Sequence, residues 1–158
     1  MKVQVSHSLR TDVGAAFKLC TEQKAQERVY AQLGGTDVKI NREGRAPRVN
    51  LRISRRMPAN PPAALRKLVP PTNDVSHTEA WAADGDGYAA QIVVDIKGVP
   101  VKILGTKTLQ PEKGGCRVSW AFDVSSGIPL LGSVIAGFAA EELRKNLEDE
   151  YKVLKAGA

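Results

Sequence analysis

The chain has 158 residues, of which 42% are hydrophobic and 25% charged, the ordinary composition of a globular protein with one core. Its net charge of +6 is uneven, because residues 1–70 hold 14 Lys and Arg against 5 Asp and Glu. No apolar stretch approaches the roughly 20 residues that span a bilayer, and the N-terminal residues lack a signal peptide's apolar core. The composition therefore predicts a cytoplasmic protein, neither secreted nor membrane-spanning.

The first segment of the chain predicts one strand and two short helices. Lys2 to Leu9 alternates apolar and polar residues, as a half-buried strand does. Thr11 and Asp12 form a helix N-cap signal before a helical spacing that ends near Cys20. A second cap at Thr21 is expected to open another helix, which ends at the glycines 34–35.

The middle of the chain predicts six strands separated by turn signals. The clearest turn is Asp84-Gly85-Asp86-Gly87, and turns this short require antiparallel neighbours. The strands are expected near residues 36–43, 47–57, 74–83, 87–97, 101–110 and 115–125. Only the connection from Pro58 to Asn73 is long, and its five prolines exclude a regular strand. It is the candidate for a mobile lid.

The last predicted element is a helix of more than six turns. It is expected to begin at Ser126-Gly127-Ile128-Pro129, with the proline in the first turn. Residues 128–140 are apolar nearly all round, whereas residues 141–155 carry charges on one face. A helix that is apolar on every side must be covered on every side, and a sheet curved around it provides that cover.

The two cysteines, Cys20 and Cys116, lie far apart and form no CxxC pair, and neither has a histidine nearby in sequence. This excludes the spacing of a structural zinc site, and no other metal or cofactor signature is present. Two buried free thiols are expected, and a disulfide stays open as the alternative. Free thiols favour a reducing compartment.

The order of these elements resembles the helix-grip fold of the START-like, or SRPBCC, superfamily. That superfamily includes the birch-pollen allergen type, polyketide cyclases and lipid-transfer domains. The resemblance spans the whole chain and includes the opening Val3–His7 strand, the Thr11–Phe17 helix entry and the Ile128–Gly132 helix entry. More narrowly, the chain is similar to uncharacterised START-like proteins of high-GC bacteria.

The resemblance implies a single α+β domain over residues 1–158. Its seven-stranded curved antiparallel sheet, in the order β-α-α-β6-α, would grip the long C-terminal helix. It also implies an apolar cavity between the sheet and that helix, which usually holds a hydrophobic ligand in this superfamily. The superfamily has no invariant catalytic motif, so the catalytic residues are unknown.

Two histidines are candidates for the cavity. His7 shares the strand parity of Val3 and Val5, so it should point inward. His77 and Glu79 share the parity of Trp81, and an inward His–Glu pair could orient a ligand or move a proton. The alternatives are a satisfied core histidine at position 7, and a strand facing the other way with His77 and Glu79 in water.

Several large side chains are expected either to pack the core or to line a pocket. They come from two strands and from the first half of the long helix: Tyr88, Trp120, Phe122, Leu131, Val134, Ile135 and Phe138. The two roles merge if the cavity is small.

A stripe of basic residues occupies the outward-facing positions of the strand expected near residues 47–57. Arg48, Arg52 and Arg56 alternate with apolar residues, and Arg55 and Lys67 would extend the stripe if the following loop folds back. A solvated sheet face and electrostatic contact with an anionic membrane are both compatible with it. Nucleic-acid binding is disfavoured, because no aromatic residue for base stacking lies between Tyr30 and Trp81.

Three functions follow as hypotheses. The first is binding or transport of a hydrophobic small molecule, such as a lipid or a polyketide-like compound. The second is an enzyme of the cyclase or hydratase kind, which uses His7, His77, Glu79 or Tyr88 as acid–base groups. The third is an electrostatic docking module for an anionic membrane or partner.

Overall fold

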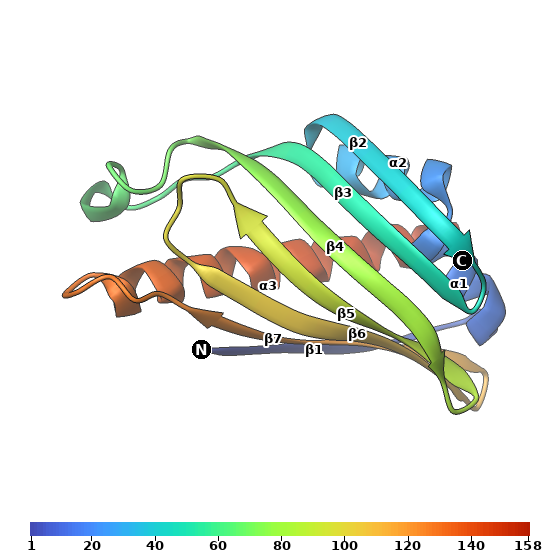
Figure 1. Cartoon of the computed structure of the whole chain (residues 1–158). Coiled ribbons are helices and arrows are strands. Elements are labelled where there is room, and N and C mark those ends of the chain that lie inside the picture. Colours follow the sequence, from blue (N-terminus) through green and yellow to red (C-terminus); the bar gives the residue numbers. More distant parts are fainter.

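The computed structural model describes residues 1–158 and contains seven strands and three α-helices (Figure 1). The strands are β1 (Lys2–Leu9), β2 (Thr36–Arg45), β3 (Arg48–Pro58), β4 (Thr72–Asp84), β5 (Gly87–Ile96), β6 (Lys102–Glu112) and β7 (Gly115–Ser125). The helices are α1 (Val13–Thr21), α2 (Gln23–Gln32) and α3 (Gly132–Gly157), with a 3-10 turn η1 (Ala63–Leu65).

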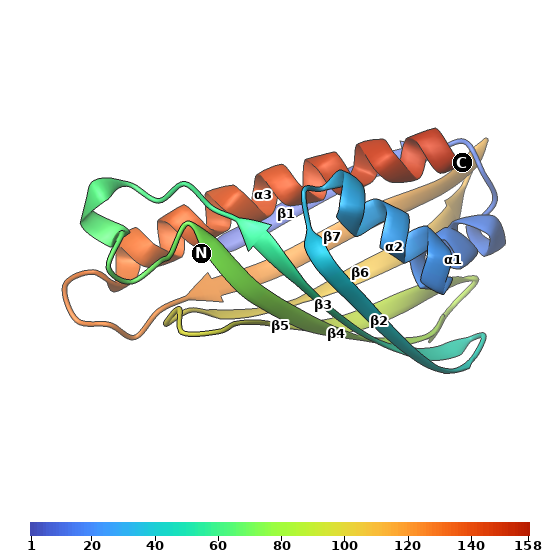
Figure 2. The ribbon, with the colours of Figure 1, turned by 90° about the horizontal axis from the view of Figure 1, so that it is seen from above.

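All seven strands form one antiparallel sheet in the order β1-β7-β6-β5-β4-β3-β2. The first strand therefore pairs with the last, and α3 runs along the inner face of the curved sheet (Figure 2). Helices α1 and α2 cover the same face at the other end, where α2 contacts β2. The predicted α+β helix-grip architecture with its long C-terminal helix is confirmed.

Local chemistry explains most element boundaries. Asp12 accepts a hydrogen bond from the backbone N–H of Ala15 at 2.9 Å, so it caps α1 as predicted. Thr21 was predicted to cap α2, and this is wrong. It is the last residue of α1, and its hydroxyl donates to the carbonyl of Phe17 in the preceding turn.

The start of α3 also differs from its prediction. Pro129 was expected in the first helical turn, but the helix begins at Gly132, because Leu130 has a positive φ of 68°. Gly132 is required there, since a Cβ atom would lie 2.8 Å from the carbonyl oxygen of Ser126. The expectation that residues 128–140 are covered on every side is wrong at Leu130, which is 99% exposed, and at Val134.

Beneath α3 lies a core of 25 buried residues drawn from every strand except β2 and from all three helices. A second, smaller cluster joins the connection between β3 and β4 to the start of α3, and it consists of Leu65, Val69, Val99 and Ile135. Cys20 and Cys116 are both buried and free, as expected. No helix is both long and apolar enough to cross a membrane.

Candidate functional site

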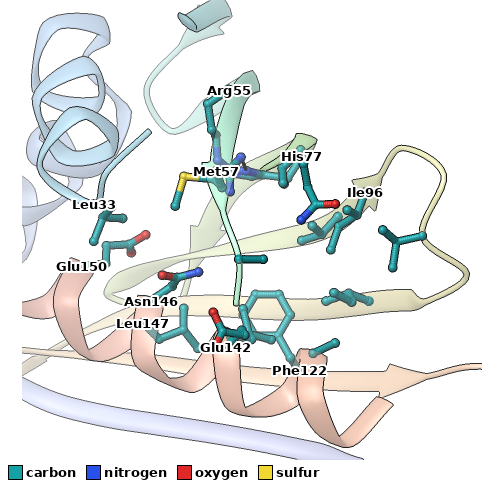
Figure 3. A pocket seen from close by; sticks show the side chains of 18 of the residues that line it. Leu33, Arg55, Met57, His77, Ile96, Phe122, Glu142, Asn146, Leu147 and Glu150 are labelled. Atoms are coloured by element: carbon teal, nitrogen blue, oxygen red, sulfur yellow. Dashed lines mark hydrogen bonds between the residues drawn. The ribbon is translucent and has the colours of Figure 1, made fainter. Parts of the chain in front are cut away.

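A cavity of about 140 Å³ lies between the inner face of the sheet and α3. Of its 27 lining residues, 18 are hydrophobic, and they come from α2, β3 to β7, the loops beside them and α3. Figure 3 shows Glu142, Asn146 and Glu150 reaching toward the cavity from successive turns of α3, opposite Arg55 and His77 on the sheet. The cavity therefore has a mainly apolar lining with a polar zone in its wall.

Six of the residues expected at the site line this cavity. They are His77, Glu79, Trp120, Phe122, Ile135 and Phe138. The strand parity that predicted inward His77 and Glu79 is correct, since these residues are only 5% and 3% exposed. Whether any of the six contacts a ligand stays a prediction.

The other four expected residues lie outside the cavity. His7 faces α3 but at the β1 edge, where it stacks on Tyr151 with 4.0 Å between ring centroids and hydrogen-bonds Glu148 at 2.7 Å. Tyr88 stacks on Phe17 beneath α1. Leu131 precedes α3 and packs on the smaller core cluster, and Val134 faces away from the sheet.

A hydrogen-bonded chain runs along the cavity wall from β3 to β4. Arg55 donates through Nη1 to His77 Nδ1, and His77 Nε2 lies 2.7 Å from Glu79 Oε2. Trp81 Nε1 donates to the other oxygen of Glu79 at 2.9 Å. Because arginine only donates, His77 Nδ1 must be the acceptor and Nε2 must carry the proton. The contacts thus fix His77 as a neutral imidazole that donates to Glu79.

A second group of polar side chains connects the sheet to the helices. Lys107 of β6 donates to Glu150 of α3 at 2.8 Å, and both side chains are at most 9% exposed. The Tyr30 hydroxyl of α2 lies 3.3 Å from His77 Nε2 and 3.5 Å from Glu150 Oε1, which joins the two groups. Such buried charges are costly unless they are paired, so they mark a functional candidate.

Burial and neighbouring charges set the protonation states of this cluster. Burial, followed by the Arg55 charge, lowers the pKa of His77. Burial alone would raise the pKa of Glu79, but the His77 hydrogen bond, the Lys107 charge and the Trp81 hydrogen bond lower it. Burial and the Glu150 charge raise the pKa of Tyr30 well above its usual range. His77 and Tyr30 are therefore neutral near pH 7, and Glu79 is ionised.

Lys107 stays charged, although its burial alone would lower its pKa. Cys20 beside it and the carboxylates of Glu150 and Glu79 raise that pKa well above the usual range. Burial raises the pKa of the Cys20 thiol to about 11, so this thiol is no nucleophile at neutral pH.

We expect His77 to carry its single proton on Nε2 at neutral pH and to have a pKa below the ordinary histidine value of about 6.5. The unfolded chain therefore binds a proton at His77 more readily than the folded protein does, so stability falls as pH drops below about 6.5. Nitrogen NMR of the imidazole, assigned with His77→Gln, measures both tautomer and pKa. A His77 pKa at or above about 6.5 would contradict the arrangement.

The sequence reasoning missed seven polar residues of the wall. Four belong to the cluster around His77, namely Tyr30, Arg55, Lys107 and Glu150, and the other three are Asn73, Glu142 and Asn146. Arg55 was expected to extend the exposed basic stripe if the following loop folded back, and this is wrong, because Arg55 lines the cavity. It has the inward parity of Ile53 and Met57, and its guanidinium lies 4.5 Å from the Tyr30 ring. Lys107 likewise shares the parity of Ile103 and Leu109. If the alternation of inward and outward positions had been applied to charged residues as well, it would have placed Arg55 and Lys107 on the inner face.

The remaining basic stripe is exposed on the outer face of the sheet. Arg48, Arg52 and Arg56 are all exposed, and Arg56 pairs with Asp74 at 3.2 Å. Contact of this stripe with an anionic membrane stays a prediction. No group of three or more His, Cys, Asp or Glu side chains is placed to hold a metal ion.

The chain shares this fold with solved structures of low sequence identity. The protein TTHA0849 from Thermus thermophilus is 16% identical with a TM-score of 0.69, over 99% of this chain and 95% of that one. Ara h 8.0201 is 12% identical with a TM-score of 0.63, over 99% and 95%.

A third similar structure is the STAR-related lipid transfer protein (fragment 25-204) from Xanthomonas axonopodis. It is 15% identical with a TM-score of 0.62, over 98% of this chain and 83% of that one. No curated protein matches the sequence. A family model described as "Protein of unknown function (DUF2505)" matches residues 4–156. The chain therefore belongs to this family, and it shares its fold with the STAR-related lipid transfer protein.

Proposed function

We propose that the protein binds a hydrophobic small molecule in the cavity between the sheet and α3. The observation that carries this proposal is a hollow in the core, lined by 18 hydrophobic residues out of 27. Protein interiors are close-packed, and voids larger than a water molecule are few. A mainly apolar hollow beside a charge cluster is the usual form of a small-molecule site.

The volume limits what this conformation can hold. At about 140 Å³ the cavity matches an engineered cavity of about 150 Å³ that binds benzene. Sites for larger ligands have about 300–1,000 Å³. A benzene-sized body therefore fits as the cavity stands, and a lipid or polyketide-like ligand requires the wall to move outward.

The connection between β3 and β4 is the part of the wall best suited to such movement. It lies outside the sheet, and Val69 and Ala59 of this connection line the cavity. It rests on α3 through the small cluster around Leu65 and Ile135 rather than through strand pairing. This supports the role of a lid, predicted for residues 58–73, at residues 59–71, because Pro58, Thr72 and Asn73 pair within the sheet.

The shared fold supports the same proposal. One similar structure is named a STAR-related lipid transfer protein, so this architecture is compatible with an apolar ligand. The cyclase or hydratase alternative has weaker support. His7 and Tyr88 lie away from the cavity, and His77 has no free lone pair while Arg55 donates to its Nδ1. A general base needs a free lone pair directed at the substrate.

Binding can be tested with toluene, an apolar probe of suitable size. We expect saturable NMR shift changes in the wild type and their loss in Ala139→Phe, because residue 139 lines the cavity and the new ring fills it. Ala80→Phe is the matched control, since Ala80 is exposed on the outer face of β4. No saturable binding, or equal binding in a folded Ala139→Phe, would contradict the proposal.

A further inference from the structure

An apolar tip protrudes from the connection between β7 and α3. Leu130 is 99% exposed, Pro129 before it is exposed, and Val134 in the first turn of α3 is 45% exposed. Leu130 also has a positive φ of 68°, a left-handed backbone that glycine adopts freely and leucine adopts at a cost. A side chain this exposed adds nothing to the core, so its presence at a strained position points to a contact outside the protein.

Two other connections lie beside this tip. Ser126 Oγ donates to the carbonyl of Pro100 at 2.6 Å, which ties the tip to the connection between β5 and β6. Ile128 and Leu131 pack on the smaller core cluster, which includes residues of the connection between β3 and β4. Figures 1 and 2 both show that connection and the tip at the end of the molecule away from the C-terminus. We call this end the loop end, and it comprises residues 59–71, 97–101 and 126–131.

The charges of the loop end have one sign. Its three connections hold Arg66, Lys67 and Lys97 and contain no Asp or Glu, and β6 begins directly after them at Lys102. All four basic side chains are exposed, and none forms a salt bridge. Four unpaired positive charges therefore lie at the same end as the exposed leucine.

This combination favours an anionic lipid surface over a protein partner. Unpaired Lys and Arg side chains are attracted to anionic head groups, and an apolar group beside a basic patch gives the two signals that stable membrane attachment requires. A single leucine at a loop tip can enter a fluid hydrocarbon layer without a complementary pocket. A protein partner would instead need a packed interface of about 800 Å² around that anchor.

The cavity reaches the same end of the molecule. Ala59, Val69 and Val99 line it, and all three belong to connections of the loop end. A lipid surface at the loop end would therefore lie beside the part of the cavity wall that is not held by strand pairing.

From these observations we propose that the loop end docks on an anionic lipid surface. Leu130 enters the apolar layer, and Arg66, Lys67, Lys97 and Lys102 face the head groups. The docking does not depend on what the cavity binds, so vesicle binding and toluene binding test separate claims.

Co-sedimentation with vesicles tests the docking at about 0.1 M salt. We expect the wild type to bind vesicles of phosphatidylcholine and phosphatidylglycerol in a ratio of roughly 2 to 1, and to bind phosphatidylcholine alone far more weakly. Leu130→Gly should lower the partition coefficient about tenfold, because it removes the inserted side chain. Its melting temperature should be unchanged or higher, since glycine suits the left-handed backbone. Val93→Ala, at a 51% exposed position on the outer face of β5, is the control and should bind as the wild type does.

A second pair of variants tests the charges. Lys67→Ser should weaken binding roughly fivefold, whereas Lys113→Ser, in the turn between β6 and β7 at the other end of the sheet, should change it less than about twofold. Three results would overturn the proposal: no binding to either vesicle, equal binding to both, or unchanged binding of Leu130→Gly. A greater loss in Arg52→Ser than in Lys67→Ser would also overturn it, because the outer face of the sheet would then contact the lipid. So would a wild-type dimer in sedimentation velocity that Leu130→Gly separates, because Leu130 would then join two copies of the chain.

Discussion

Replacing Lys107 with Met should destabilise the protein by about 3–5 kcal/mol, because it leaves the Glu150 carboxylate buried without its counterion. The lysine side chain is 2% exposed and the carboxylate 9%, so water compensates for little of the loss. Urea unfolding followed by circular dichroism measures the change in unfolding free energy.

Two further variants show whether this loss comes from the stranded charge. Lys107→Met combined with Glu150→Met should recover most of the stability, since two packed apolar side chains can replace a buried ion pair. Lys2→Met removes a lysine paired with Asp123 at 2.7 Å on the surface, and this change should cost less than about 1 kcal/mol. Equal effects of Lys107→Met and Lys2→Met would contradict the buried pairing.

Replacing Gly105 with Val should destabilise the protein by about 3 kcal/mol, the upper part of the usual range for overpacking. A Cβ atom at this position would lie 2.3 Å from Phe122 Cδ1 and 2.5 Å from the carbonyl oxygen of Ala121. The Phe122 ring occupies the space that a side chain would need, so the change must displace this ring of the cavity wall. Thermal unfolding and toluene titration report the two consequences.

Gly127→Val provides the control for this change. Gly127 has no heavy atom within 4 Å of its ideal Cβ position and no positive φ, so a side chain there meets open space. Its unfolding free energy should stay within about 0.5 kcal/mol of the wild type. If the Gly105→Val variant were stable and bound toluene normally, the Phe122 ring would not form part of the cavity wall as described.

Alternation along the strands predicted most of the fold, because a sheet with one buried face imposes a period of two on its sequence. The Asp84–Gly87 turn and the Asp12 cap appear where local chemistry requires them. The start of α3 was misplaced because Pro129 suits a first helical turn, whereas the break depends on the positive φ of Leu130. Backbone geometry of that kind leaves no reliable trace in the residue types.

The polar part of the site was harder to predict because its members come from five separate elements. Tyr30 lies on α2, Arg55 on β3, Lys107 on β6 and Glu150 on α3, and only His77 and Glu79 of β4 were identified beforehand. Each of these charged residues stands at an inward-facing position of its element, although a charged side chain is ordinarily expected on the solvent-facing side. Only the three-dimensional pairing of the strands and helices shows that opposite charges meet inside.

The central claim is that an apolar molecule occupies the interior between the sheet and α3. Intermolecular NOEs from toluene to assigned methyl groups test it most directly. The account predicts cross-peaks to Ile103 and Ile135, whose side chains line the cavity. Cross-peaks confined to the exposed Leu130 and Val134, or none at saturating toluene, would contradict it.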